Sequence, residues 1–233
     1  MLARHDLLWL SEQGWREAVW TVPEEAAPAL LRWHACGWPV IVRRADADLS
    51  PGQVSVGIPL PPRAEDGRKL RVAGRVALDA IVRHAPPLPL GQLTGMPADW
   101  QTPLAALAQQ AQQAQAQQAQ AHGLAIGVYG SAALQAITGQ AYLRAGSDID
   151  LLLQPRSVAE LDTALALLRT HARGLPLDGE IVFPGGRAVA WKELSAAREG
   201  SLASRVLVKE LRRVALVRID ELLASLEEQA CLN

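Results

Sequence analysis

The chain has 233 residues, of which 49% are hydrophobic, and its formal net charge is -1 at pH 7. This length and apolar content allow a full core in one large domain or two small ones, and we favour two. The balanced charge gives no overall attraction to nucleic acid or to an anionic membrane, so we expect neither as a partner. No apolar run approaches the roughly 20 residues that span a bilayer. Cys36 and Cys231 lie far apart and no secretory leader is evident, so we expect a reduced, cytoplasmic protein.

Residues 1–90 predict a small α+β module. A helix is expected over 24–37, because its apolar residues keep helical spacing and a glycine and a proline follow its end. Short segments that are β-branched or alternate in polarity predict three strands, at 39–44, 54–58 and 69–72.

Residues 86–102 are rich in proline, glycine and small side chains, which indicates a connector. Residues 103–122 are almost wholly Ala, Gln and Leu, which favours a polar helix. A second domain over 103–233 is therefore predicted as an α/β (α+β) fold with a mixed sheet and flanking helices, because strands and helices alternate along it. Its expected elements are strand 124–129, helix 132–137, strand 149–153, helix 158–170, strands 180–183 and 188–191, and helices 201–209 and 214–226.

The strongest chemical signal is the pair Asp148 and Asp150 at the start of an apolar strand. Since side chains alternate along a strand, both carboxylates are expected on one face, roughly 7 Å apart along the chain. Oxygen ligands of this kind suit Mg²⁺ or Mn²⁺, and Mg²⁺ usually takes one or two carboxylates and completes its shell with water and phosphates. A lone Asp-x-Asp is weak evidence, because it also occurs as a solvated turn.

A second motif strengthens that interpretation. The apolar run 124–129 leads directly into Gly130-Ser131 and then a helix. A glycine lets backbone N–H groups approach a phosphate, and the helix N-terminus favours an anion. Strand, Gly-Ser, helix and then Asp-x-Asp on the next strand resemble the nucleotidyltransferase superfamily that includes DNA polymerase β.

That resemblance implies a third carboxylate on a later neighbouring strand, and two candidates stand there. Glu180 is preferred because it begins the apolar run, whereas Asp178 precedes a turn glycine. The choice depends on order along the chain alone, and an ordinary turn with an exposed strand entrance stays open for both. Asp148, Asp150 and Glu180 are thus the predicted catalytic residues.

The match extends beyond the superfamily. The segments Thr138-Gly139, Tyr142-Leu143, 147–152, 178–180 and 188–193, together with 38–44, 56–61 and 69–71 in the first module, resemble the phosphoribosyl-dephospho-CoA transferase family, the holo-acyl-carrier-protein synthases of malonate decarboxylase. This resemblance covers nearly the whole chain except the Gln-rich tract.

The resemblance implies transfer of 2'-(5''-phosphoribosyl)-3'-dephospho-CoA from its triphosphate precursor to a serine of the apo acyl carrier subunit, with release of diphosphate. The module 1–90 would then recognise the donor or the carrier protein. Two other possibilities stay open: a nucleotidyltransferase with a different acceptor, such as a small molecule, tRNA or another protein, and a non-catalytic regulator with this fold.

Several further residues are candidates for substrate binding. Guanidinium groups bind phosphate in a bidentate fashion, so Arg43 and Arg44 could contact the donor or an acidic carrier, although a solvated strand edge explains them equally well. Lys192 follows the β segment after Glu180 and is a better phosphate candidate by position. Gly130, Ser131 and Ser147 complete the predicted substrate-binding set.

Overall fold

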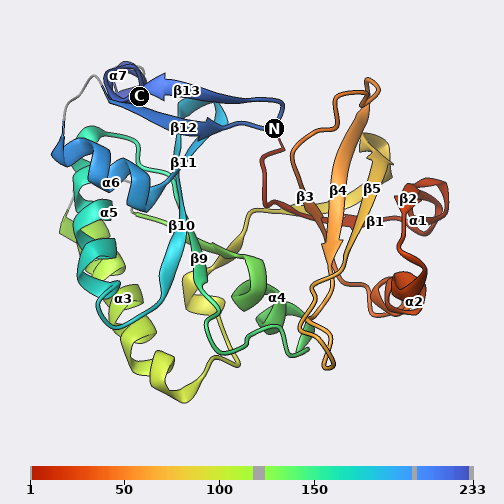
Figure 1. Cartoon of the computed structure of the whole chain (residues 1–233). Helices are drawn as coiled ribbons and strands as arrows, with labels where there is room; N and C mark the ends of the chain where they lie inside the picture. Colours follow the sequence, from red (N-terminus) through yellow and green to blue (C-terminus); the bar gives the residue numbers. More distant parts are fainter. Residues whose placement is uncertain (1, 118–123, 201–203, 231–233) are drawn as a thin grey trace. The chain divides into compact units, whose positions relative to one another are not determined.

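The computed structural model describes residues 2–117, 124–200 and 204–230 (Figure 1). The chain divides into two compact units. Unit 1 comprises Met1–Pro87 and Ile137–Tyr142, and unit 2 comprises Leu88–Ala136 and Leu143–Asn233. Both units combine helices with sheets, which confirms the predicted α+β class.

Unit 1 is built on a six-stranded antiparallel sheet with strand order β2-β5-β4-β3-β1-β6. Its elements are β1 (Leu7–Leu10), α1 (Glu12–Glu17), β2 (Val19–Thr21), α2 (Ala27–Ala35), β3 (Val40–Val42), β4 (Gln53–Pro59), β5 (Arg71–Ala77) and β6 (Ile81–Ala85). The helix predicted over 24–37 is confirmed as a 3-10 turn (Glu24–Ala26) that leads into α2. The three strands β1, β2 and β6 and the helix α1 were not predicted.

One face of this sheet forms the core of unit 1. Alternate residues of β4, Val54, Val56 and Ile58, are buried, as are Val72 and Val76 on its neighbour β5. Burial of such a side chain stabilises a fold by about 1.5–3 kcal/mol. The opposite face is free to carry polar groups.

Unit 2 is built on a seven-stranded mixed sheet with strand order β13-β12-β11-β10-β9-β8-β7. Strands β9 and β10 pair in parallel, and the other neighbouring strands are antiparallel. The elements are β7 (Leu88–Pro89), α3 (Ala98–Gln117), β8 (Ile126–Tyr129), α4 (Gly130–Thr138), β9 (Ile149–Leu153), α5 (Val158–His171), β10 (Leu177–Phe183), β11 (Arg187–Ala190), α6 (Trp191–Glu199), β12 (Arg205–Lys209), β13 (Val214–Arg218) and α7 (Ile219–Ala230).

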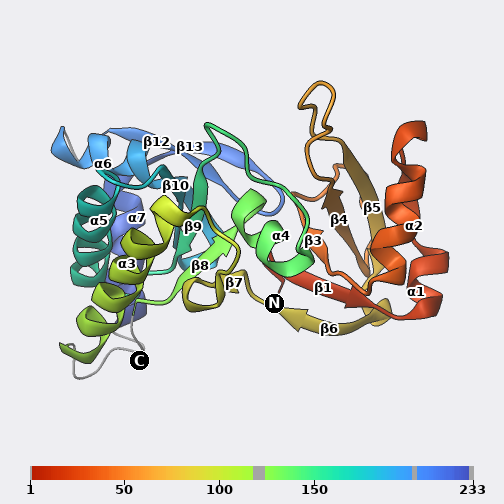
Figure 2. The same ribbon diagram turned by 90° about the horizontal axis from the view of Figure 1, so that it is seen from below.

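The two faces of the unit 2 sheet differ in chemistry. Helices α3, α5, α6 and α7 cover one face (Figure 2), and they pack against alternate strand residues such as Leu151, Ile181 and Val208. The residues between these, including Asp150 and Glu180, point to the other face, because side chains alternate along a strand. We call this second side the open face of unit 2.

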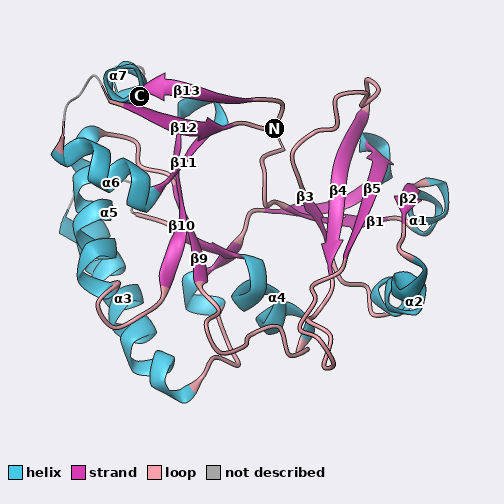
Figure 3. Cartoon of the chain, in the orientation of Figure 1, coloured by secondary structure: helices cyan, strands magenta, loops and turns pink. Residues whose placement is uncertain are grey.

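The predicted helix at 201–209 is wrong where the structure describes it, and the predicted helix at 214–226 is wrong over 214–218 but confirmed from Ile219 onward. Residues 205–209 and 214–218 form the hairpin β12–β13, and only α7 from Ile219 onward is helical (Figure 3). The reason is the period of two: Val206 and Val208 are buried, whereas Arg205 and Leu207 are exposed. Alternation with β-branched residues favours a strand. Residues 201–203 lie outside the described chain.

The segment 86–102 contributes more to unit 2 than a connector would. Strand β7 pairs with β8, and Leu90 and Met96 are buried in the core of the unit. The Ala- and Gln-rich helix is present as α3, which ends at Gln117, and the remainder of the predicted helix lies outside the described residues. Throughout the described chain, no helix is long and apolar enough to cross a membrane.

Candidate active site

The Asp148–Asp150 motif lies where β9 begins. Asp150 is the second residue of β9, and Asp148 precedes the strand and is exposed. Ile149 and Leu151 point into the core and are fully buried. Because the apolar residues fix the alternation, Asp150 is held on the open face of the sheet.

Gly130 brings the Gly-Ser turn against this carboxylate. Strand β8 ends at Tyr129, and helix α4 begins at Gly130 without an intervening loop. The φ of Gly130 is +69°, which is in the left-handed region, and a Cβ there would collide with Oδ2 of Asp150. Only glycine therefore allows the turn and the carboxylate to lie this close. The N-terminus of α4, with Ser131 as its second residue, thus lies beside an aspartate.

The sheet register shows which later carboxylate lies beside Asp150. In the parallel pairing of β10 with β9, Asp178 is opposite Asp150, whereas Glu180 is opposite Leu152. Paired residues of neighbouring strands are about 4.8 Å apart. On the other side, Tyr129 is opposite Asp150. A row of three polar residues, Tyr129, Asp150 and Asp178, thus crosses the open face, and Glu180 lies one row further along.

The carboxylate of Glu180 forms an ion pair with a lysine. Its carboxylate is buried, with the residue 4% exposed, and Nζ of Lys209 on β12 lies 3.1 Å from its Oε1. An unpaired buried carboxylate would be strongly destabilising, so Lys209 compensates its charge. The sequence did not single out Lys209, because 29 residues separate it from Glu180 and only the sheet brings the two together.

Lys192 and Ser147 each have a partner in unit 2. Nζ of Lys192, in the first turn of α6, lies 3.7 Å from Oδ1 of Asp178, and both side chains are partly exposed. The hydroxyl of Ser147 accepts a hydrogen bond from the N–H of Arg144 at 2.9 Å, and this bond closes the turn before Asp148. Lys192 therefore lies at the site, and Ser147 shapes the loop that carries Asp148.

The donor atoms are those that a hard divalent cation prefers. Asp148, Asp150 and Asp178 offer carboxylate oxygens, and no histidine or cysteine is among them. Within the described residues, no cluster of three or more His, Cys, Asp or Glu side chains is arranged to hold a metal ion. A Mg²⁺ site nevertheless usually needs only one or two protein carboxylates, because water and substrate phosphates fill the other positions, so the donor set fits such an ion.

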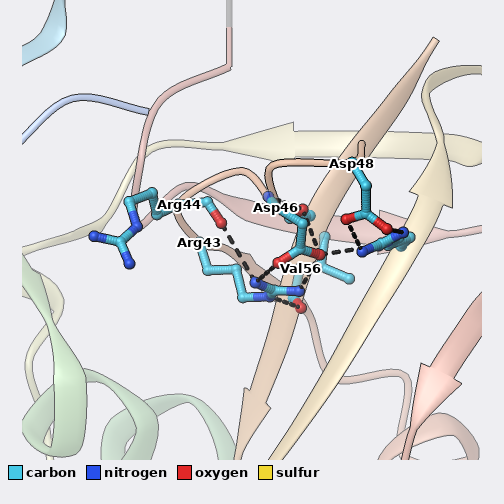
Figure 4. Close-up of polar contacts among 7 residues, drawn as sticks. Arg43, Arg44, Asp46, Asp48 and Val56 are labelled. Carbon is cyan, nitrogen blue, oxygen red and sulfur yellow. Dashed lines mark hydrogen bonds and ion pairs between the residues drawn. The ribbon is translucent and has the colours of Figure 1, made fainter. Parts of the chain in front are cut away.

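The adjacent arginines Arg43 and Arg44 of unit 1 have different surroundings (Figure 4). Nη1 and Nη2 of Arg43 each donate to a carboxylate oxygen of Asp46 at 2.6 Å, and its Nε donates to the Val56 carbonyl at 2.9 Å. The side chain of Arg44 points away from this network and is exposed. Arg43 is thus engaged within unit 1, whereas Arg44 is available to an external anion.

Asp46 is the centre of that network. It also accepts hydrogen bonds from Nε of Arg75 at 2.9 Å and from the buried Ser55 hydroxyl at 3.2 Å. The hydrogen bond from Arg43, assisted by that from Arg75, holds the pKa of Asp46 well below its ordinary value, although partial burial opposes the shift. The loop after β3 is therefore held to β4 and β5 by a charged clamp.

Comparison with known proteins adds family information. Residues 92–220 match the model described as the phosphoribosyl-dephospho-CoA transferase MdcG C-terminal domain, and residues 3–87 match that of the N-terminal domain. Proteins named phosphoribosyl-dephospho-CoA transferase are similar over most of their length. One from Xanthomonas campestris pv. campestris is 37% identical over 212 residues, which cover 90% of this chain and 91% of that protein.

Two further relatives carry the same name. The protein from Bradyrhizobium diazoefficiens is 37% identical over 218 residues, covering 92% of this chain and 89% of that protein. The protein from Pseudomonas aeruginosa is 34% identical over 193 residues, covering 78% of this chain and 81% of that protein. No solved structure shows significant similarity.

Proposed function

The chain belongs to the phosphoribosyl-dephospho-CoA transferase family, and on that premise we propose that it attaches a CoA-derived prosthetic group to a carrier protein. The donor is 2'-(5''-triphosphoribosyl)-3'-dephospho-CoA, and the acceptor is a serine of the apo acyl carrier subunit of malonate decarboxylase. Diphosphate leaves. The reaction is a nucleotidyl transfer, because the serine oxygen forms a bond to the α-phosphorus of a nucleotide triphosphate while the bond to the diphosphate oxygen breaks.

The observation that carries this proposal is the approach of Gly130 to Asp150. A helix N-terminus beside a carboxylate would suit a triphosphate with its cation, because the N-terminus favours an anion and the carboxylate favours a metal ion. In this reading Gly130 and Ser131 bind the β- and γ-phosphates. Their N–H and hydroxyl groups stabilise the charge that builds on the leaving diphosphate.

Asp148 and Asp150 are the residues that would hold Mg²⁺ or Mn²⁺. When bound, such an ion neutralises phosphate charge and orients the α-phosphorus. We propose Asp178 as the third carboxylate in place of Glu180, because the register puts it beside Asp150. There it can accept the proton of the attacking serine or complete the metal shell. Lys192, 3.7 Å from Asp178, would balance its charge between turnovers.

The direct experiment is intact-mass measurement of the apo carrier subunit after incubation with the enzyme, the triphosphate donor and Mg²⁺. We expect a mass gain equal to the prosthetic group, its loss in EDTA, and its return with added Mg²⁺ or Mn²⁺. No mass gain with authentic components would refute the proposal. Labelling of a different acceptor, or adenylylation from ATP instead, would assign the site to another nucleotidyl transfer.

A further inference from the structure

The open face of the β12–β13 hairpin carries apolar side chains that water contacts. Leu207 on β12 is opposite Leu216 on β13, and Val214, two residues before Leu216, lies on the same face opposite Lys209. These side chains are 38%, 61% and 41% exposed, respectively. Val206 and Val208, which alternate with them, are fully buried in the core. The hairpin therefore needs one face for its own packing and presents the other, apolar face to solvent.

Positive charge borders this apolar strip. Arg205 and Arg218 are directly opposite each other at one end, and Lys209 lies at the other. Arg218 is paired with Asp220 and Lys209 with Glu180, whereas the side chain of Arg205 has no hydrogen-bond or ion-pair partner among the residues the structure describes. Arg205 is therefore the positive charge of this strip that an acidic ligand could pair with.

The strip lies on the same face of the sheet as the candidate active site, with the buried residues Glu180 and Ala188 between them. Lys209 and Glu180 meet on the open face at 3.1 Å, and Glu180 is one row from Asp178. The face thus runs from Asp150 on β9 across β10 and β11 to Leu216 on β13, which is four strand spacings or about 19 Å. That span suits a protein surface better than a small acceptor.

The expected direction of phosphoryl transfer also puts the acceptor on the side of the sheet that carries the hairpin. Gly130 and Ser131 follow β8, which lies next to β9 on the side away from β10. Attacking and leaving oxygens are roughly in line during phosphoryl transfer. If diphosphate leaves over the Gly130-Ser131 turn, the acceptor oxygen must arrive from the side of β10 to β13.

We propose that the open face of the hairpin, with Arg205, Leu207, Val214, Leu216 and Arg218, is the docking surface for the acceptor carrier protein. This proposal rests on the proposed function. The partner is a folded protein with a small apolar patch and acidic residues, because its chemistry must complement leucines bordered by arginines. A second copy of this chain is the alternative occupant, and the experiment below distinguishes it from a carrier protein.

The test compares Leu216→Ser and Arg205→Glu with a matched pair on α2, Leu31→Ser and Arg32→Glu. Leu31 is 71% exposed and Arg32 is exposed beside it, so the control pair makes the same changes away from the hairpin. We expect each hairpin variant to raise the acceptor KM roughly tenfold, as a lost interface contact of about 1.4 kcal/mol would. Donor KM should stay within about twofold, as should both KM values of the controls.

Direct binding of the apo carrier, measured by fluorescence anisotropy without donor, separates the two proposals. If the wild type binds the carrier and Arg205→Glu raises the Kd of that binding about tenfold, the docking surface is supported, whether or not transfer is seen. Transfer with an unchanged acceptor KM in both hairpin variants would overturn the docking surface and leave the proposed function intact. A dimer that Leu216→Ser converts to a monomer, with unchanged carrier binding, would also overturn it by assigning the face to a second copy.

Discussion

Asp178 stands directly opposite Asp150 in the parallel pairing of β10 with β9, and both side chains lie on the open face of the sheet. Glu180 lies one row away, buried and paired with Lys209. This relationship distinguishes two carboxylates that are only two residues apart in sequence.

We therefore expect Asp178→Asn to lower kcat of transfer by about 100-fold or more, because an acceptor for the serine proton or a metal ligand is lost. Glu180→Gln should lower kcat by less than about tenfold, since its carboxylate contacts Lys209. Steady-state kinetics at saturating donor and carrier, with Mg²⁺ titrations of both variants, measure the difference. The reverse order of the two effects would restore Glu180 as the third carboxylate.

Gly130→Ala should inactivate the protein with the fold retained. The new Cβ would displace the Asp150 carboxylate, and a misplacement of about 1 Å can cost about 100-fold in rate. Gly185→Ala is the matched control in unit 2, because Gly185 has a φ of +78° and nothing within 4 Å of a Cβ there. Both variants should lose about 1 kcal/mol of stability from a left-handed alanine, but only Gly130→Ala should lose activity. Equal kcat values for the two would show that the turn does not position Asp150.

Arg43→Ala and Arg44→Ala should have different consequences. Arg43 donates to Asp46 and to the Val56 carbonyl, so its removal should destabilise unit 1 by about 1–3 kcal/mol. Arg44 is exposed, so its removal should leave stability unchanged within about 0.5 kcal/mol. If Arg44 contacts a donor phosphate, the same variant raises the donor KM. Urea unfolding followed by tryptophan fluorescence and a donor titration measure the two effects, and an unchanged donor KM would remove Arg44 from the substrate-binding set.

The Asp46 clamp predicts an acid-sensitive unit 1. The pKa of Asp46 is lowered in the folded state, first by the hydrogen bond from Arg43, so folding is favoured while the carboxylate is ionised. This stabilisation is fully present above the unfolded pKa of about 3.9 and is lost as the pH falls through the lower folded value. Asp46→Asn should therefore reduce stability by about 1–2 kcal/mol at pH 7 and have a weaker pH dependence below about pH 4.

Unfolding midpoints of wild type and Asp46→Asn at pH 7 and at about pH 3 test this expectation. Asp79→Asn is the control, because Asp79 is an exposed carboxylate of the same unit outside this network. Parallel pH profiles for wild type and Asp46→Asn would contradict the assigned origin of the acid sensitivity.

Short sequence patterns were enough to predict the class of fold and the two motifs of the candidate site. The run from residue 124 to Gly130-Ser131 and the Asp148–Asp150 pair are local patterns, and local chemistry fixes what they form: an apolar strand, a turn that requires glycine, and alternation that puts polar residues on one face. Helix α5 and the strands β8, β9 and β10 were predicted for the same reason.

Three features could be read only from the folded chain: the carboxylate that lies beside Asp150, the lysine that pairs with Glu180, and the arginine that is exposed. Each of these depends on the register between strands that are distant in sequence, and register is set by packing across the whole sheet rather than by any local pattern. The hairpin β12–β13 shows the same limit, because its alternating segments are only five residues long and it is their pairing that places Val206 and Val208 in the core. Short motifs thus predict which residue types the candidate site contains, and long-range strand pairing determines which of these residues lie side by side.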